Sequence, residues 1–263
     1  MYSKRSVNVS TERSPKENDL TFGVELECLF SSRATLANVL RDRNININYE
    51  GYNHNSSKTA YKIVSDGSVR ETGLESSEIV SPILKGAKGL QSLQNVCNEL
   101  TALNVKVNKT CGLHVHIGAE KFTSKQWQNL YINYFRLENL IDSFMPGSRR
   151  GNFYCKGLQN LSNYENNIMR CSNVDDIKSY FNSDRYFKIN PCSYSRHKTV
   201  EFRQHGGTVE FEKVEMWVSF LRKLVVFSQN NLVENCSSIN DLTFLNASEK
   251  RFFNSRVSKF QTV

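Results

Sequence analysis

Three short segments of this chain alternate apolar residues with charged or imidazole side chains, and this pattern constrains the fold more than any other feature. A period of two is typical of a β-strand, in which residues i and i+2 project from the same face. Each segment therefore predicts a strand with one apolar face and one face that carries reactive groups. The residues predicted on these polar faces are Glu25 and Glu27 in the first segment, His114 and His116 in the second, and Glu201, Arg203 and His205 in the third.

Taken singly, each of these patterns is typical of an ordinary strand. A lone Glu-x-Glu pair is usually solvated, a His-x-His pair is either packed or metal-bound, and a Glu-x-Arg pair usually forms a weak surface ion pair. The three segments all lie in apolar surroundings, so we expect them to share one sheet. Carboxylates on a desolvated sheet face repel one another unless a cation lies between them. The combination predicts a divalent-cation site, and the excess of carboxylates favours Mg²⁺ or Mn²⁺.

Arg203 lies two residues beyond Glu201 and is predicted on the same strand face. A guanidinium beside a bound cation is suited to bidentate contacts with phosphate oxygens. This arrangement predicts phosphoryl chemistry on a nucleotide. The chain has no G-x-x-x-x-G-K-[ST] or G-x-G-x-x-G stretch. We therefore expect cations and side chains, rather than a glycine-rich loop, to hold the phosphates.

The remaining periodicity predicts a mixture of strands and helices without an internal repeat. The predicted strands cover residues 22–30, 61–64, 78–81, 112–118, 185–189 and 197–204. The predicted helices cover residues 35–43, 86–103, 124–144, 173–181 and 209–232. An Asn-rich loop or hairpin is expected between the first helix and the second strand, and Asp66-Gly67 predicts a turn.

Composition and charge argue against several classes of protein. The polar first 18 residues predict a disordered or loosely attached tail rather than a secretory signal, and no apolar run is long enough for a membrane span. Seven cysteines without a C-x-x-C pair predict reduced thiols and a cytoplasmic location. The net charge of +8 suits phosphate or carboxylate ligands. It favours nucleic acid less, because the basic residues are spread along the chain.

Five blocks of the chain resemble the motifs of the putative amidoligase family in order and in approximate spacing. They are FGVELE at 22–27, SDGS at 65–68 with EIVSP at 78–82, CGLHVH at 111–116, SRRGNFYC at 148–155, and TVEFRQH at 199–205. The resemblance covers about residues 20–220. It implies an α+β fold with a curved antiparallel sheet of about six strands backed by helices, similar to the glutamine synthetase catalytic domain. Residues 19–235 would form this domain, preceded by the tail at 1–18 and followed by a helical extension at 236–263.

The same resemblance implies ATP-driven formation of an amide bond through an acyl phosphate. The implied cofactors are ATP and Mg²⁺ or Mn²⁺, and the implied partners are a small carboxylate and an amine, or a peptide. By position, the metal ligands would be Glu25, Glu27, Glu78, His114 and Glu201. The ATP site would include Glu27, with His116 and Arg203 touching phosphates, and charge would be neutralised by Arg149 or Arg150. For Asp66, a structural role in the predicted turn is preferred to a role as a functional carboxylate.

Two other functions stay open from the sequence. A metal-dependent hydrolase would use the imidazoles and carboxylates to activate water, without ATP and with no evident role for Arg203. A non-catalytic basic binding protein on a degenerate ligase fold would act on nucleic acid, or in a phage or envelope assembly. Cys155 lies near basic residues and is a candidate nucleophile, but a buried structural thiol is the preferred interpretation.

Overall fold

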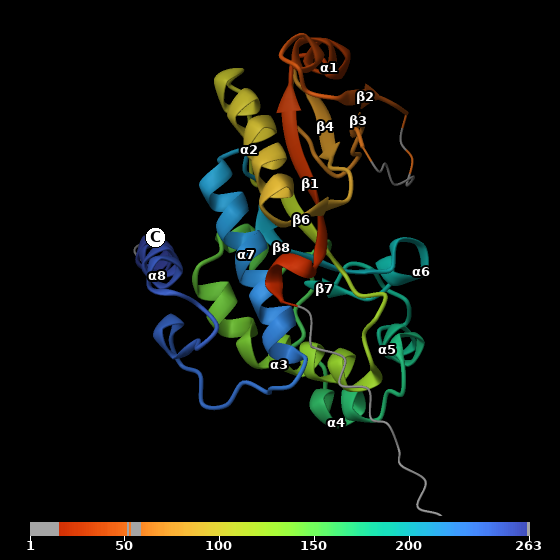
Figure 1. Ribbon diagram of the computed structural model, residues 1–263, viewed down its shortest axis with the longest axis vertical. Coiled ribbons are helices and arrows are strands. Elements are labelled where there is room, and N and C mark those ends of the chain that lie inside the picture. Colours follow the sequence, from red (N-terminus) through yellow and green to blue (C-terminus); the bar gives the residue numbers. More distant parts are fainter. Residues whose placement is uncertain (1–15, 52, 54–58, 262–263) are drawn as a thin grey trace, which may run out of the picture.

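A long first strand, β1 (Thr21–Phe30), lies in the middle of the sheet and pairs with strands on both sides (Figure 1). The computed structural model describes residues 16–51, 53 and 59–261. Most of the predicted N-terminal tail, residues 1–15, and part of the predicted Asn-rich loop lie outside the described residues. The apolar residues of β1 alternate as predicted, because Phe22, Val24 and Leu26 are each at most 2% exposed.

The sheet is open and mostly antiparallel, and its strand order is β2-β3-β4-β1-β6-β8-β7, with β5 paired to the start of β1. Among the described residues it has eight strands, of which only β2 and β3 run parallel. The bounds of the remaining strands are β2 (Ile47–Tyr49), β3 (Tyr61–Val64), β4 (Glu75–Val80), β5 (Leu84–Lys85), β6 (Gly112–Gly118), β7 (Ile189–Asn190) and β8 (Thr199–Gly206). The α+β class is thus confirmed. The expected six strands were too few, because β2 and β5 are too short for a detectable period.

Helices pack against one face of this sheet and leave the other face to the polar side chains. Tyr134 of α3 packs on Phe202 of β8, and Arg222 of α7 lies over the ring of Phe22 in β1. The helices are α1 (Arg33–Asp42), α2 (Gly86–Ala102), α3 (Ser124–Ser143), α4 (Tyr164–Met169), α5 (Val174–Tyr180), α6 (Ser193–His197), α7 (Phe211–Ser228) and α8 (Ala247–Gln261), with 3₁₀ turns at Glu17–Asp19, Gly147–Arg149 and Ile239–Asp241.

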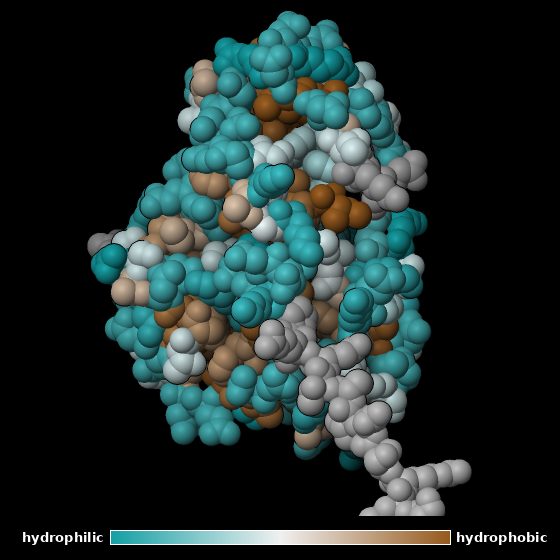
Figure 2. Space-filling view, viewed as in Figure 1, coloured by the Kyte–Doolittle hydropathy of each residue, from teal (hydrophilic) through white to brown (hydrophobic). Residues whose placement is uncertain are grey.

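The outer surface is mostly polar, because the apolar faces of the helices are turned toward the sheet. Figure 2 shows a largely hydrophilic face on which apolar side chains gather over the region of α3 and α7. No helix in the described part of the chain combines the length and the apolar character that a membrane crossing requires.

Two predicted strands are wrong in their bounds. Residues 185–188 form a turn and an isolated bridge, and only Ile189–Asn190 pair as β7. His197 closes the short helix α6 and does not begin a strand, because Lys198 takes a left-handed conformation with φ 55° and β8 starts after it. Sequence periodicity cannot detect this break between α6 and β8, because the break depends on the left-handed conformation of a single residue.

A β-bulge in β8 overturns a further prediction. Leu113 pairs with His205 while Val115 pairs with Phe202, so β8 has one residue more than β6 over this stretch. The extra residue changes which face the following side chains occupy. His205 therefore leaves the face of Glu201 and Arg203, and its ring lies 5.7 Å from that of Trp217 in α7.

Candidate active site

Strand pairing brings the predicted polar residues onto one face at the centre of the sheet. Glu27 of β1 lies opposite Glu78 of β4, and Glu25 lies opposite His114 of β6. On the next strand, Glu201 lies opposite His116. Partners in an antiparallel pair project from the same face. These residues form the group that we call the acidic cluster: Glu25, Glu27, Glu78, Glu201, His114 and His116.

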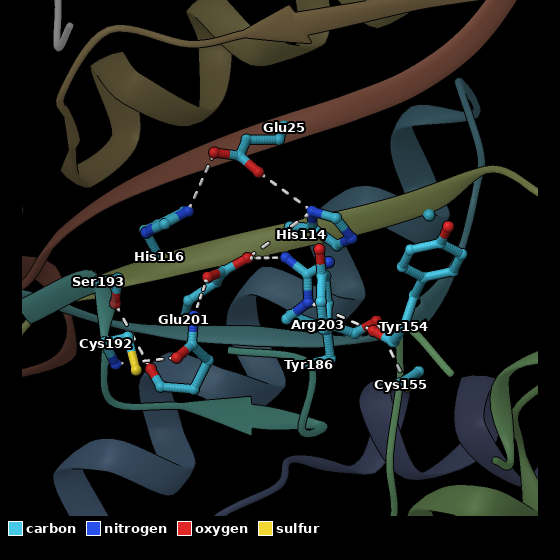
Figure 3. Close-up of polar contacts among 12 residues, drawn as sticks. Glu25, His114, His116, Tyr154, Cys155, Tyr186, Cys192, Ser193, Glu201 and Arg203 are labelled. Atoms are coloured by element: carbon cyan, nitrogen blue, oxygen red, sulfur yellow. Dashed lines mark hydrogen bonds and ion pairs between the residues drawn. The ribbon is translucent and has the colours of Figure 1, made fainter. Parts of the chain in front are cut away.

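Glu25 is the hub of the acidic cluster (Figure 3). Its two carboxylate oxygens lie 3.0 Å from Nδ1 of His114 and 3.2 Å from Nε2 of His116. The far nitrogen of the His114 ring is 3.3 Å from Glu27, and its Nδ1 is 3.8 Å from Glu201. His114 thus lies beside three of the four carboxylates of the cluster.

The charges in the acidic cluster do not balance locally. Burial alone would raise the pKa of Glu25, but the neighbouring His116 and His114 hold it well below the usual range. Burial also favours a raised pKa for Glu201, and here the guanidinium of Arg203 outweighs it and lowers the value. Glu78 pairs with no cation among the described residues: burial, followed by the charges of Glu25 and Glu27, raises its pKa well above normal. The folded chain therefore disfavours a full set of ionised glutamates.

One subset of the cluster has metal-binding geometry. Glu25, His116 and Glu201 each offer a ligand atom, and these atoms lie within 4.8 Å of one another. His116, predicted to contact phosphate, thus belongs to this triad, whereas His114, predicted as a metal ligand, lies between Glu25 and Glu27. Carboxylate oxygens with one imidazole suit a hard or borderline divalent cation.

The cluster lies in a cavity of about 1770 Å³, which is lined by all six of its residues and by Asp66, Asn190 and Arg203. Ligand pockets for single small molecules usually measure about 300–1,000 Å³. The cavity therefore has room for a nucleotide together with a second substrate. Asp66 accepts hydrogen bonds from the backbone and hydroxyl of Ser68, both at 2.6 Å, and so has the predicted turn role while its side chain borders the cavity.

The two predicted arginines of the fourth block separate in the fold. Arg149 ends a 3₁₀ turn, is 4% exposed and donates from Nε to the carbonyl oxygen of His205 at 3.1 Å. One of its terminal nitrogens has no hydrogen-bond partner among the described residues. Arg150 instead donates to the carbonyl oxygens of Met145 and Phe260, toward α8. Neither side chain lines the cavity.

Arg149 nevertheless reaches the back of the acidic cluster. A Cβ built on Gly112 would lie 1.7 Å from a terminal nitrogen of Arg149 and 2.9 Å from Nε2 of His114. The backbone N–H of the same glycine donates to Glu27 at 2.6 Å. Only a residue without a side chain allows the guanidinium to lie this close to the strand.

Several cavity residues have no periodic signal in the sequence. Asn190 donates to Glu201 at 2.5 Å from the two-residue strand β7, and Tyr186 borders the cavity from the preceding turn. Lys62, 4% exposed, donates to the carbonyl and side-chain oxygens of Asn53. A different feature of the sequence could have identified Lys62, because it is the one charged residue in an otherwise apolar strand.

The surroundings of Cys155 agree with the prediction of a buried structural thiol rather than a nucleophile. It is fully buried, and burial raises its pKa to about 11 despite the nearby Arg149. Its sulfur lies 3.6 and 3.7 Å from the carbonyl oxygens of Arg149 and Arg203. A thiol that stays protonated is a poor nucleophile.

The chain also matches a known protein family. The family model described as "Putative amidoligase enzyme" matches residues 18–225, which include every residue of the acidic cluster. No curated protein matches the chain. Because the family match covers well over half of the chain and contains the whole polar face of the sheet, this protein belongs to the putative amidoligase family, a family of ligase type.

Proposed function

We propose that this protein is an ATP-dependent carboxylate–amine ligase, which activates an acid as an acyl phosphate on a fold of the glutamine synthetase catalytic type. The observation that carries the proposal is the acidic cluster, buried in a cavity large enough for two substrates. Residues 19–235 would be the catalytic domain and 236–263 its extension. The acid and the amine are small molecules or a peptide.

The residues fit one or two divalent cations. The triad of Glu25, His116 and Glu201 offers three ligand atoms, and the facing pair of Glu27 and Glu78 offers further carboxylate oxygens. The raised pKa of Glu78, caused by burial and by its acidic neighbours, indicates that the cluster lacks positive charge. Bound Mg²⁺ or Mn²⁺ would neutralise the phosphates and polarise the γ-phosphoryl group.

Arg203 is the side chain proposed to hold the γ-phosphoryl group. Its guanidinium contacts Glu201 at 2.5 Å, and its charge, stabilised by that carboxylate, stays fixed at the cavity wall. A carboxylate oxygen of the acid attacks the γ-phosphorus, the bond to the bridging oxygen breaks, and ADP leaves. The amine nitrogen then attacks the acyl carbon, phosphate leaves with the C–O bond electrons, and the amine loses a proton. Arg149 provides positive charge behind Glu27 and His114.

The proposal is tested with hydroxylamine as a surrogate amine. The purified chain is incubated with ATP, MgCl₂ and panels of amino acids, peptides and other acids, and both hydroxamate and ADP are measured. We expect one class of acid to give equal amounts of the two products, and the Glu25→Gln variant to give neither.

Three outcomes would contradict this function. Release of AMP would indicate adenylation instead of acyl phosphate formation. Cleavage of an ester or amide without ATP would favour the metal-dependent hydrolase. Absence of any nucleotide turnover and of any ATP–Mg²⁺ binding would favour a non-catalytic protein on this fold.

A further inference from the structure

Three aromatic side chains lie together on the Arg203 side of the cavity. Phe153, Tyr154 and Tyr186 have ring centroids 5.1 to 5.4 Å apart, in tilted and edge-to-face arrangements. Tyr154 and Tyr186 line the cavity, and the ring of Phe153, which is not a lining residue, packs against both of them. We call this group the aromatic cluster.

Two members of the aromatic cluster are exposed and Tyr186 is half-buried, unlike the aromatic side chains that pack in the core. Phe153 is 63% and Tyr154 40% exposed, whereas Phe202, Trp217 and Phe220 are fully buried. Contiguous exposed apolar surface on a folded domain usually marks a binding site. Because Tyr154 and Tyr186 also line the cavity, a ligand bound in the cavity can contact the aromatic cluster.

Arg203 connects the aromatic cluster to the acidic cluster. Its Cζ lies 5.8 Å from the ring centroid of Tyr186, and its Nε donates to the carbonyl oxygen of Tyr154 at 3.4 Å. A second guanidinium, that of Arg185, lies 5.3 Å from the same Tyr186 ring. In Figure 3 Tyr154 lies beyond Arg203, on the side opposite His116, and Tyr186 lies next to Arg203. A polyanion that starts at Glu25 and Glu201 would thus pass these guanidinium groups before it meets the rings.

We infer that the base of the nucleotide stacks on the aromatic cluster. This inference rests on the proposed function, which puts the phosphates at the cations and at Arg203. A nucleoside triphosphate is elongated, so its base lies far from the γ-phosphoryl group. Aromatic side chains bind any base through its flat face, at about 1–3 kcal/mol for each stacked base. The opposite end of the cavity, at Lys62, Asp66 and Glu78, is charged and polar. That end is left for the acid and the amine.

The test compares a ligand that has a base with one that has none. The affinities of ADP–Mg²⁺ and of tripolyphosphate–Mg²⁺ are measured by calorimetry for the wild type and for the double variant Phe153→Ala/Tyr154→Ala. The matched control is Tyr49→Ala, which removes a tyrosine that is 47% exposed and lies outside the cavity. Thermal melts check the fold, which exposed side chains should affect little.

We expect the double variant to bind ADP roughly 10-fold more weakly and tripolyphosphate as tightly as the wild type, while the control binds both normally. Unchanged ADP affinity would overturn the inference and leave the proposed function intact. So would a rise in the KM of the acid with an unchanged KM for ATP, which would assign the rings to the acid. A wild type that binds neither ligand would instead overturn the proposed function, and this inference with it.

Discussion

Two groups of charged side chains lie on either side of β8, and they differ in how their charges are balanced. The acidic cluster faces the cavity and contains a glutamate, Glu78, with a raised pKa caused by burial and acidic neighbours. On the helix side, Lys188 is fully buried and donates to Glu138 at 2.7 Å and to both oxygens of Asp142 at 2.8 Å. Gln204 and Tyr134 extend this buried network by two further bonds of 2.6 Å.

The difference separates a structural group from the proposed ligand site. The buried network pairs its ammonium with neighbouring carboxylates, as buried polar groups in stable cores do. It also lies directly behind the proposed phosphate contact, because the backbone N–H of Arg203 donates to the carbonyl oxygen of Lys188 at 2.9 Å. The acidic cluster is instead short of positive charge, which a ligand would supply. Substitutions in the two groups should therefore have different effects.

The largest expected effect is on stability, from Lys188→Met. This change leaves Glu138 and Asp142 without their counterion, and Glu138 is only 1% exposed. Breaking a buried ion pair costs about 3–5 kcal/mol. Urea denaturation measures the free energy of unfolding, and Lys213→Met, which removes an ion pair with Glu210 near the surface, is the control. Equal losses in both variants would show that the network contributes no more than a surface pair.

In the acidic cluster, Glu78→Gln should have the opposite profile. The raised pKa of Glu78 indicates that its ionised form is disfavoured in the fold, and glutamine resembles the protonated acid. We expect an equal or higher free energy of unfolding without divalent cations, and ligase turnover lower by about 10²–10³. Urea denaturation and the hydroxamate assay give the two values. A destabilised but fully active variant would reverse the assignment of this residue.

A divalent cation should stabilise the protein through the acidic cluster alone. Mn²⁺ or Mg²⁺ at 100 times its dissociation constant is expected to add about 2.7 kcal/mol to the free energy of unfolding. The measurement is a melt in EDTA against one in added metal. The Glu25→Gln variant is expected to lose this shift, and Lys213→Met to keep it. A shift of equal size in all variants would place the cation elsewhere.

The effect that is smallest at neutral pH, and that grows only in acid, concerns the bulge residue His205. Burial, and then the charge of Arg256, lowers its pKa to about 3, so it stays neutral in the fold while the unfolded chain protonates near the ordinary value of about 6.5. The contribution of neutral His205 to the free energy of unfolding is therefore fully present above that ordinary value. It falls as the pH drops toward 3, by up to about 1.4 kcal/mol per pH unit. In His205→Gln this contribution should vanish. Parallel curves of unfolding free energy against pH for the two proteins would refute it.

The acidic cluster was predictable from the sequence because its residues obey one rule. Glu25, His114 and Glu201 each lie at alternate positions in a long strand, and the family resemblance added Glu78. The buried network was not predictable. Lys188 lies in a bend, and its partner Glu138 looks like an ordinary polar position of an amphipathic helix.

Neighbours in sequence were also separated by local geometry. A 3₁₀ turn buries Arg149 and directs Arg150 toward α8, and no pattern in two adjacent arginines reveals which one turns inward. The aromatic cluster likewise combines two residues of one loop with Tyr186 from a turn more than thirty positions later. Such contacts depend on tertiary structure, which strand and helix periods do not encode.

The extra residue in β8 divides this strand into two independent halves. Before it, Glu201 and Arg203 belong to the chemistry of the cavity; after it, His205 belongs to the packing on Trp217. Deletion of Gln204, the residue between them, would remove the bulge, yet the imidazole would stay opposite Leu113 on the core face. A single-codon deletion at this point would thus add no histidine to the polar face, and it would remove the amide that bonds Tyr134 and Asp142 in the buried network.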